Sequence, residues 1–288
     1  MNEHTLLRCM TALVTEPWLI TPVMHKTLCD IVIAHVNTPE KQHALASAMP
    51  QNPSPRQFAM AGDSVAVIPV DGVIGRKFSS SLYSSGVTSV DVLARLVDMA
   101  AQDDEVNAIL MVYDSPGGTV QGVTEAGKAI LRARESKPVL AYADGQMCSA
   151  AYWLASQSDA VYAWEEATVG SIGVYSAFLD QSRAMEMAGI KPVIFKSGDH
   201  KAMGFPGTSL TEGQIAMLQA RVDEIGVQFR GMVRQGRARD IADETMQGQS
   251  FTAKESLANG LVDSITDMAT ALKDAGSIGR KRKQAKGI

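Results

Sequence analysis

The chain has 288 residues, of which 45% are hydrophobic, 6% aromatic and 20% charged, and its formal net charge is −4. This length and composition predict a globular protein with one large domain, and they exclude a chain that is disordered throughout. Five of the 27 basic residues lie in the last nine residues, with no acid among them, so the rest of the chain is more acidic than the total suggests. This acidic body argues against a nucleic-acid-binding core.

The cysteines and the hydropathy pattern exclude several other classes. Cys9, Cys29 and Cys148 show no Cys-x-x-Cys spacing, so we expect neither a zinc site nor a disulfide framework, and a reducing compartment fits best. No run of 18 apolar residues predicts a transmembrane helix, and residues 1–20 lack the features of a signal peptide. We therefore expect a cytoplasmic protein without a membrane span.

Four segments are predicted along the chain. Residues 1–48 have the apolar spacing of a helical extension, and residues 49–63 form a proline-rich linker. Residues 64–270 form the main domain. Residues 271–288 form a basic tail, for which a solvated, disordered terminus is the favoured interpretation and contact with nucleic acid or another acidic partner the alternative.

Short apolar runs alternate with helical patterns in the main domain. Strands are predicted at 65–70, 106–113, 138–143, 160–164, 171–175, 192–195 and 261–263. Helices are predicted at 89–101, 120–135, 149–156, 179–188 and 211–236, with another that begins at 253 and ends at Asn259-Gly260. This alternation predicts an α/β fold with mainly parallel strands.

Three loops that follow predicted strands carry groups suited to catalysis. Asp-Ser-Pro-Gly-Gly at 114–118 offers glycines that permit close backbone approach, although a plain turn would look the same. Ser149 opens a helix of small residues, where most serines are simple N-caps. The loop at 195–202 contains Lys196 and Lys201, and surface lysine is the ordinary interpretation of both.

Read together, these segments resemble a known family. They are Asp-Ser-Pro-Gly-Gly at 114–118, Met-Cys-Ser-Ala at 147–150, Gly-Ser-Ile-Gly-Val at 170–174, Ser-Gly-Asp-His-Lys at 197–201 and Ala-Asn-Gly-Leu-Val-Asp at 258–263. In this order they resemble the serine–lysine peptidases of the signal peptide peptidase A (SppA) type, and more closely the prohead proteases of lambda-like phages. The resemblance spans about residues 64–266 and implies a ClpP/crotonase-like fold.

The resemblance also implies roles for individual residues. Ser149 matches the nucleophile and Lys201 the general base, while Ser171 matches a serine that hydrogen-bonds the lysine amine. Gly117 or Gly118, together with the Ala150 amide, matches the oxyanion hole. The resemblance implies no metal and no other cofactor.

Several alternatives for these roles remain open. Lys196 lies five residues before Lys201, but the Ser-Gly-x-x-Lys pattern selects Lys201. His200 is a possible partner for the serine, and Cys148 a possible thiol nucleophile. Many relatives have glycines after the serine where this chain has alanines, a difference that keeps the turn tight.

The resemblance to phage head proteases implies protein substrates: scaffold, portal or capsid proteins. It also implies a homo-oligomeric ring located in the host cytoplasm or inside the prohead. A bacterial SppA-like peptidase that degrades signal peptides is the alternative within the family. A crotonase-like acyl-CoA enzyme and a non-catalytic head protein are the alternatives outside it.

Overall fold

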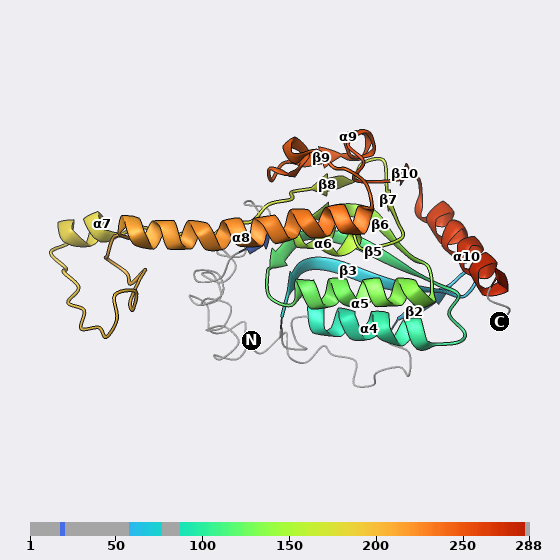
Figure 1. Ribbon diagram of the computed structural model, residues 1–288, viewed down its shortest axis with the longest axis horizontal. Coiled ribbons are helices and arrows are strands. Elements are labelled where there is room, and N and C mark those ends of the chain that lie inside the picture. Colours follow the sequence, from blue (N-terminus) through green and yellow to red (C-terminus); the bar gives the residue numbers. More distant parts are fainter. Residues whose placement is uncertain (1–17, 21–57, 77–86, 286–288) are drawn as a thin grey trace, which may run out of the picture.

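The structure is a computed structural model that describes residues 18–20, 58–76 and 87–285. A ten-stranded sheet forms its centre (Figure 1). The strands are β1 (Trp18–Ile20), β2 (Ala59–Ala61), β3 (Val65–Gly75), β4 (Val87–Ser89), β5 (Ala108–Thr119), β6 (Val139–Cys148), β7 (Ala160–Ala163), β8 (Thr168–Gly170), β9 (Ser250–Thr252) and β10 (Ser264–Ile265). The helices are α4 (Val90–Gln102), α5 (Val123–Ser136), α6 (Ala150–Ala155), α7 (Ser182–Met187), α8 (Glu212–Arg237), α9 (Ala253–Ala258) and α10 (Met268–Ala285), with a 3₁₀ turn at Asp243–Met246.

The central strands run parallel in the order β3, β5, β6, β7 and β10. Strands β4 and β8 also pair in parallel, with β3 and β6, whereas β1, β2 and β9 pair antiparallel. Near-continuous burial along β3, β5 and β6 fits a parallel sheet that is covered on both faces. The predicted α/β class with mainly parallel strands is confirmed.

Bulges divide the sheet into two branches. The register shifts between Asp71 and Val73 in β3, and between Tyr113 and Ser115 in β5. Before the shift β6 pairs with β7, and after it β6 pairs with β8. Because a bulge bends a strand, the ends of β5, β6 and β8 turn away together and bring their following loops to one place.

Helices cover the two faces of the sheet. Helices α4, α5 and α6 pack on one face, and α10 packs on the other through Ala271 and Ala275 (Figure 1). The C-terminal half of α8 lies along α6, where Phe229 stacks on the buried Trp153 with ring centroids 4.7 Å apart. Gly236 permits this approach, because a Cβ there would lie 2.2 Å from the Ser156 carbonyl oxygen.

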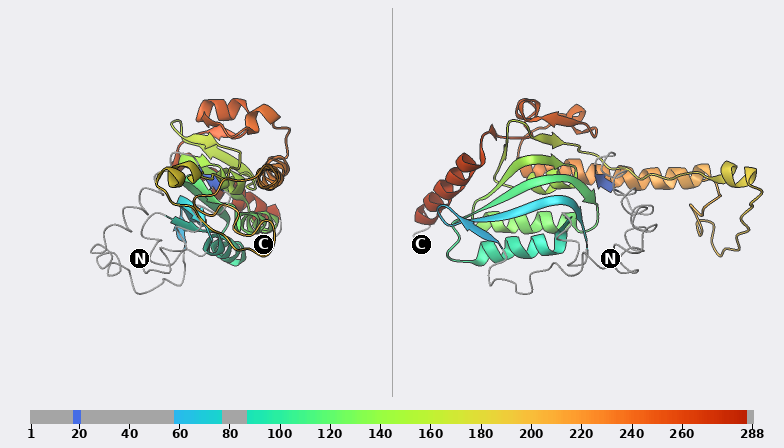
Figure 2. Two further views of the ribbon diagram at one scale, coloured as in Figure 1. Left: turned by 90° about the vertical axis from the view of Figure 1, so that its left-hand side faces the viewer. Right: turned by 180° about the vertical axis from the view of Figure 1, so that it is seen from behind.

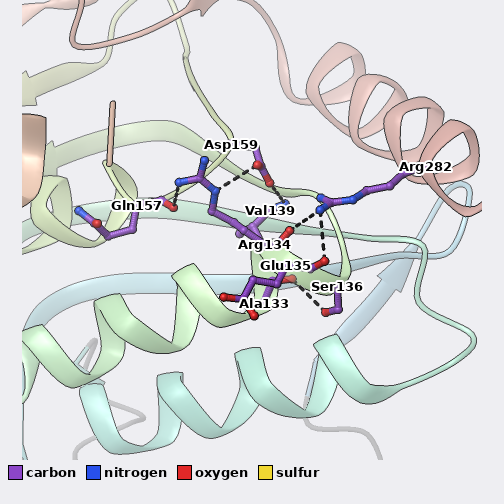
Figure 3. Close-up of polar contacts among 8 residues, drawn as sticks. All are labelled: Ala133, Arg134, Glu135, Ser136, Val139, Gln157, Asp159 and Arg282. Carbon is purple, nitrogen blue, oxygen red and sulfur yellow. Dashed lines mark hydrogen bonds and ion pairs between the residues drawn. The ribbon is translucent and has the colours of Figure 1, made fainter. Parts of the chain in front are cut away.

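The basic C-terminal segment is helical and docked, which corrects the expectation of a disordered tail. Arg282 of α10 donates to the carbonyls of Arg134 (2.6 Å) and Glu135 (3.3 Å) in the last turn of α5 (Figure 3). A cation at this end of a helix is favourable because the final carbonyls lack partners. Arg280 pairs with Asp63, so part of the tail's charge is balanced within the chain.

The long helix α8 begins far outside the body. We call residues 176–223 the arm: it comprises α7, the loop that follows, and the N-terminal half of α8, and it projects beyond one end of the sheet (Figures 1 and 2). Gln214 is the one buried side chain in this fully described stretch, and it forms a capping box with Thr211. The arm exposes large apolar side chains, namely Phe178, Leu179, Met187, Ile190, Val193, Phe195, Phe205, Ile215 and Met217.

Three secondary-structure expectations differ from the structure. The segment at 192–195 forms no strand, because the exposed arm offers it no partner strand. The strand expected at 171–175 lies at Thr168–Gly170 and ends where Ser171 takes a φ of 52°. The strand expected at 261–263 lies instead at Ser264–Ile265.

The helical extension predicted for residues 1–48 lies outside the described residues, except for Trp18–Ile20, which form strand β1. Pro17 and Pro22 bracket this apolar stretch and disfavour a helix through Trp18–Ile20. Residues 49–57 of the predicted linker also lie outside the described residues.

Asp263 links the C-terminal end of α8 to the sheet through hydrogen bonds. Its carboxylate accepts hydrogen bonds from Arg237 (2.7 Å), Arg239 (2.8 Å) and the Val161 N–H (2.7 Å). Burial raises the pKa of Asp263, but these hydrogen bonds outweigh burial and hold the pKa below its ordinary value. The carboxylate therefore stabilises the fold above the pKa of an unfolded aspartate, about 3.9, and this contribution is lost as pH falls through the lower folded-state pKa.

Asp263→Asn is expected to lower the free energy of unfolding by about 2 kcal/mol at pH 7, because charge-assisted hydrogen bonds to two arginines are weakened. Urea unfolding followed by circular dichroism measures this loss. The exposed Asp240→Asn is the matched control and should change stability by less than about 0.5 kcal/mol. An equal loss in both variants at pH 7 would contradict the assigned role of Asp263.

Candidate active site

Ser149 occupies a strained turn between β6 and α6. Its φ and ψ are 57° and −117°, a combination that a residue with a Cβ adopts at a cost of about 1–3 kcal/mol. Two hydrogen bonds hold it: its N–H donates to the Gly170 carbonyl at 2.7 Å, and its carbonyl accepts from the Trp153 N–H at 2.9 Å. A sharp strand-to-helix turn of this kind presents a side chain at the end of a sheet.

The Ser149 hydroxyl does not act as a helix cap. The side chain makes no capping hydrogen bond to α6, although capping is the ordinary role of serine at this position. Its Oγ is buried and has no hydrogen-bond partner among the described residues. Because an unpaired buried hydroxyl is costly, its retention here fits a reactive group better than a structural one.

Gly117 lies directly against Ser149. Its φ is +104°, and a Cβ there would lie 2.9 Å from Ser149 Cβ and 3.0 Å from the Cys148 carbonyl oxygen. The Gly117 N–H donates to Ser115 Oγ at 3.2 Å, and that hydroxyl donates to the Gly72 carbonyl at 2.5 Å. The loop at 114–118 is therefore held rigidly beside the hydroxyl.

Gly118 is the last residue of the 114–118 loop, and Ala150 directly follows Ser149. A Cβ on Gly118 would lie 1.7 Å from the Ile74 carbonyl oxygen, so Gly118 packs against β3. Ala150 is buried and is the first residue of α6, where backbone N–H groups have no partner within the helix. The Ala150 N–H is thus suited to stabilise negative charge next to Ser149.

Ser171 follows β8 just as Ser149 follows β6. Cys148 and Gly170 are register partners in this parallel pair, so the next residues, Ser149 and Ser171, emerge side by side. Ser171 also has a positive φ, 52°, and its N–H donates to the Gln249 carbonyl at 2.8 Å. The structure thus brings Ser149, Gly117, Ala150 and Ser171 together.

Lys201 does not join this group within a single chain. It is exposed in the loop between α7 and α8, at the projecting end of the arm, and Ser149 is buried in the body (Figure 2). Lys196 lies in the same loop and donates from Nζ to the Asp199 carbonyl at 2.8 Å. His200 is exposed there as well, so each candidate base near the Ser-Gly-Asp-His-Lys motif lies on the arm.

The Cys148 thiol packs against β8 and β9. Its Sγ lies 3.6 Å from the Thr168 carbonyl oxygen and 3.8 Å from Ser250 Oγ, on the side of β8 and β9. Burial raises the pKa of Cys148 to about 11, although hydrogen bonds from Ser250 and Met147 oppose the rise. The thiol is therefore protonated near neutral pH and is a poor nucleophile.

The sequence prediction missed strand β1 as a neighbour of the site. Trp18, Leu19 and Ile20 pair with Thr119, Gly118 and Gly117, the loop that flanks Ser149. The local signal was a short aromatic and β-branched run between two prolines. Its pairing partner, a hundred residues later along the chain, had no signal in the sequence.

Among the residues that the structure describes, no helix is both long enough and apolar enough to cross a bilayer.

Comparison with known proteins identifies relatives. Residues 132–280 match the model of peptidase family S49. The chain is 30% identical over 256 residues to capsid assembly protease C of Escherichia phage lambda, covering 86% of this chain and 58% of that protein. It is 31% identical over 219 residues to head-tail preconnector protein GP5 of Enterobacteria phage P21, covering 73% and 44% respectively.

The chain thus spans about half the length of the curated relatives that it matches. Among solved structures, it is similar to an enoyl-CoA hydratase/isomerase family member, with 17% identity, a TM-score of 0.45, and coverage of 78% of this chain and 75% of that one. The predicted resemblance to SppA-type peptidases and phage proteases is confirmed by the family and the lambda relative.

If peptide hydrolysis is the activity of this chain, Cys148→Ala is expected to leave its rate within about twofold of wild type, because the buried thiol packs against β8 and β9 and is protonated below pH 11. Iodoacetamide labelling of the native protein at pH 8, mapped by mass spectrometry, should modify Cys148 only after unfolding. Loss of hydrolysis in Cys148→Ala, together with rapid labelling in the folded protein, would assign the nucleophile to the thiol.

Proposed function

This chain belongs to peptidase family S49, and from that membership we propose that it is a serine endopeptidase in which Ser149 is the nucleophile and Lys201 the general base. One observation supports the nucleophile above all: a buried, unpartnered hydroxyl in a strained turn at the start of α6. The neighbouring Gly117 and the Ala150 N–H support an oxyanion site beside it.

The proposed reaction runs in two steps. Neutral Lys201 accepts the proton of Ser149 Oγ, which attacks the carbonyl carbon of a substrate peptide bond. The N–H of Ala150 and a backbone N–H of the Gly117-Gly118 loop stabilise the oxyanion, and the lysine returns the proton to the departing amine. A water molecule, deprotonated by the same lysine, then hydrolyses the acyl-enzyme, while Ser171 orients the lysine amine.

This chemistry requires the arm to pack against a body. A lysine accepts a proton near neutral pH only where burial disfavours its charged form, whereas Lys201 lies on an exposed arm. We propose that the arm of one copy places Lys201 beside Ser149 of another copy. The apolar side chains that the arm exposes support this association, because their burial between copies is favourable.

We further propose that the protein acts in phage head assembly, where it degrades scaffold and trims portal or capsid proteins. Support comes from the similarity over most of the chain to a phage capsid assembly protease and a phage head-tail preconnector protein. The same proposal places the protein inside the prohead, in the host cytoplasm. It also includes assembly into a homo-oligomeric ring.

Ser149→Ala and Lys201→Ala should each abolish cleavage of co-expressed scaffold and portal proteins, lowering the rate by at least about 10³-fold, because each removes a group that acts in the chemical step. Lys196→Ala is the matched control, since it removes a lysine from the same loop, and its rate should stay within a fewfold of wild type. Gel analysis of the co-expressed proteins measures cleavage. Full activity in Lys201→Ala together with loss in Lys196→Ala would transfer the base to Lys196.

Mixing purified Ser149→Ala with Lys201→Ala should restore part of the activity, about a quarter of wild type for random pairing of copies. The reason is that a mixed pair can join an intact Ser149 from one copy to an intact Lys201 from the other. Peptide hydrolysis by the mixture, compared with each variant alone, measures this. A mixture that stays as inactive as its parts, although co-purification of differently tagged variants shows mixed assembly, would place both residues of the dyad in one chain.

A further inference from the structure

Strand β1 lies along the edge of β5 that faces Ser149. At Gly117 and Gly118 the other edge of β5 pairs with β3, so β1 must occupy the side along which β6 runs. Strand β6 leaves that side after Met147, when the chain turns at Ser149 into α6. Strand β1 therefore fills the position that β6 vacates, next to the candidate nucleophile.

The backbone of β1 comes close to Ser149. A Cβ on Gly117 would lie 2.1 Å from the Leu19 carbonyl oxygen and 2.9 Å from Ser149 Cβ. The Leu19 carbonyl oxygen and Ser149 Cβ can therefore lie no farther apart than the sum of these two distances. A carbonyl of an extended segment thus lies near the Ser149 backbone, on the side of the Gly117-Gly118 loop.

Two consecutive side chains of β1, Leu19 and Ile20, are buried. Leu19 is 0% exposed and Ile20 is 3% exposed, and Leu19 belongs to the main hydrophobic core cluster. The core therefore encloses an aliphatic side chain of an extended strand beside the Gly117-Gly118 loop. Main-chain pairing with a pocket for one side chain is a common way in which proteins bind extended peptides.

We propose that Trp18–Ile20 occupies the groove for the substrate peptide, so that the chain carries its own pseudosubstrate. The inference rests on the proposed function, because the groove is defined by Ser149. Substrates would pair antiparallel with residues 117–119 and insert an aliphatic side chain where Leu19 now lies. They would bind only when β1 leaves, which couples access to Ser149 to the pairing of β1 with β5.

Peptide binding to the full-length Ser149→Ala protein tests the proposal without any chemistry. The probe is a fluorescent peptide with the sequence of residues 15–24, Thr-Glu-Pro-Trp-Leu-Ile-Thr-Pro-Val-Met. Adding Leu19→Ala to the protein should tighten binding of this peptide about tenfold by fluorescence anisotropy, because the competing segment is weakened. A peptide with aspartate in place of its leucine should bind at least about tenfold more weakly than the original.

Leu93→Ala is the matched control, since Leu93 is also a buried leucine but lies in α4, against the sheet. It should lower the urea midpoint of unfolding and leave peptide affinity unchanged, whereas Leu19→Ala should shift the midpoint much less. If Leu19→Ala lowers the midpoint as much as Leu93→Ala and leaves affinity unchanged, β1 is an ordinary core strand and the proposal is overturned.

Hydrogen exchange gives a second measurement on the Ser149→Ala protein. Saturating peptide should increase exchange of the amides at 18–20 and preserve protection at 117–119, because one strand replaces another. Unchanged exchange at 18–20 in the presence of bound peptide would place the peptide elsewhere and overturn the proposal. Cleavage plays no part in either measurement, so a chain that binds as expected but hydrolyses nothing would refute only the proposed function.

Discussion

The close approach of three backbone segments at Ser149 is the constraint on which the site depends. Ser149 can hold its strained conformation because Gly170 accepts its N–H on one side and Gly117 has no Cβ on the other. A side chain at Gly117 would collide with both Ser149 and the Leu19 carbonyl. The same glycine thus permits both the turn that presents the hydroxyl and the close approach of β1 beside it.

The molecule separates a rigid body from an exposed arm. The body buries Ser149 within parallel strands and helices whose packing leaves its position little freedom. The arm carries Lys196 and Lys201 together with most of the large apolar side chains that the described residues expose. The proposed mechanism therefore requires association of copies before Lys201 can reach Ser149.

Local sequence patterns predicted most of the elements but not all of their partners. The helices at α4, α5, α6 and α8 begin and end within a few residues of their predicted bounds, because apolar spacing and caps are local signals. The strand expected at 192–195 is absent because a strand also needs a neighbour, which the arm does not provide. The basic tail was misjudged for a related reason, since the α5 carbonyls that bind Arg282 are distant in sequence.

The sequence by itself determined the α/β class, the family, and the residue types at the site, because each depends on short motifs in a set order. Only the tertiary structure decided which of these residues meet. It placed Gly117, Ser149, Ala150 and Ser171 together through the registers of β5, β6 and β8, and it put Lys201 on the arm. It also paired Leu19 with Gly118 beside Ser149, an arrangement that arises from strand pairing between distant segments and leaves no mark in either segment alone.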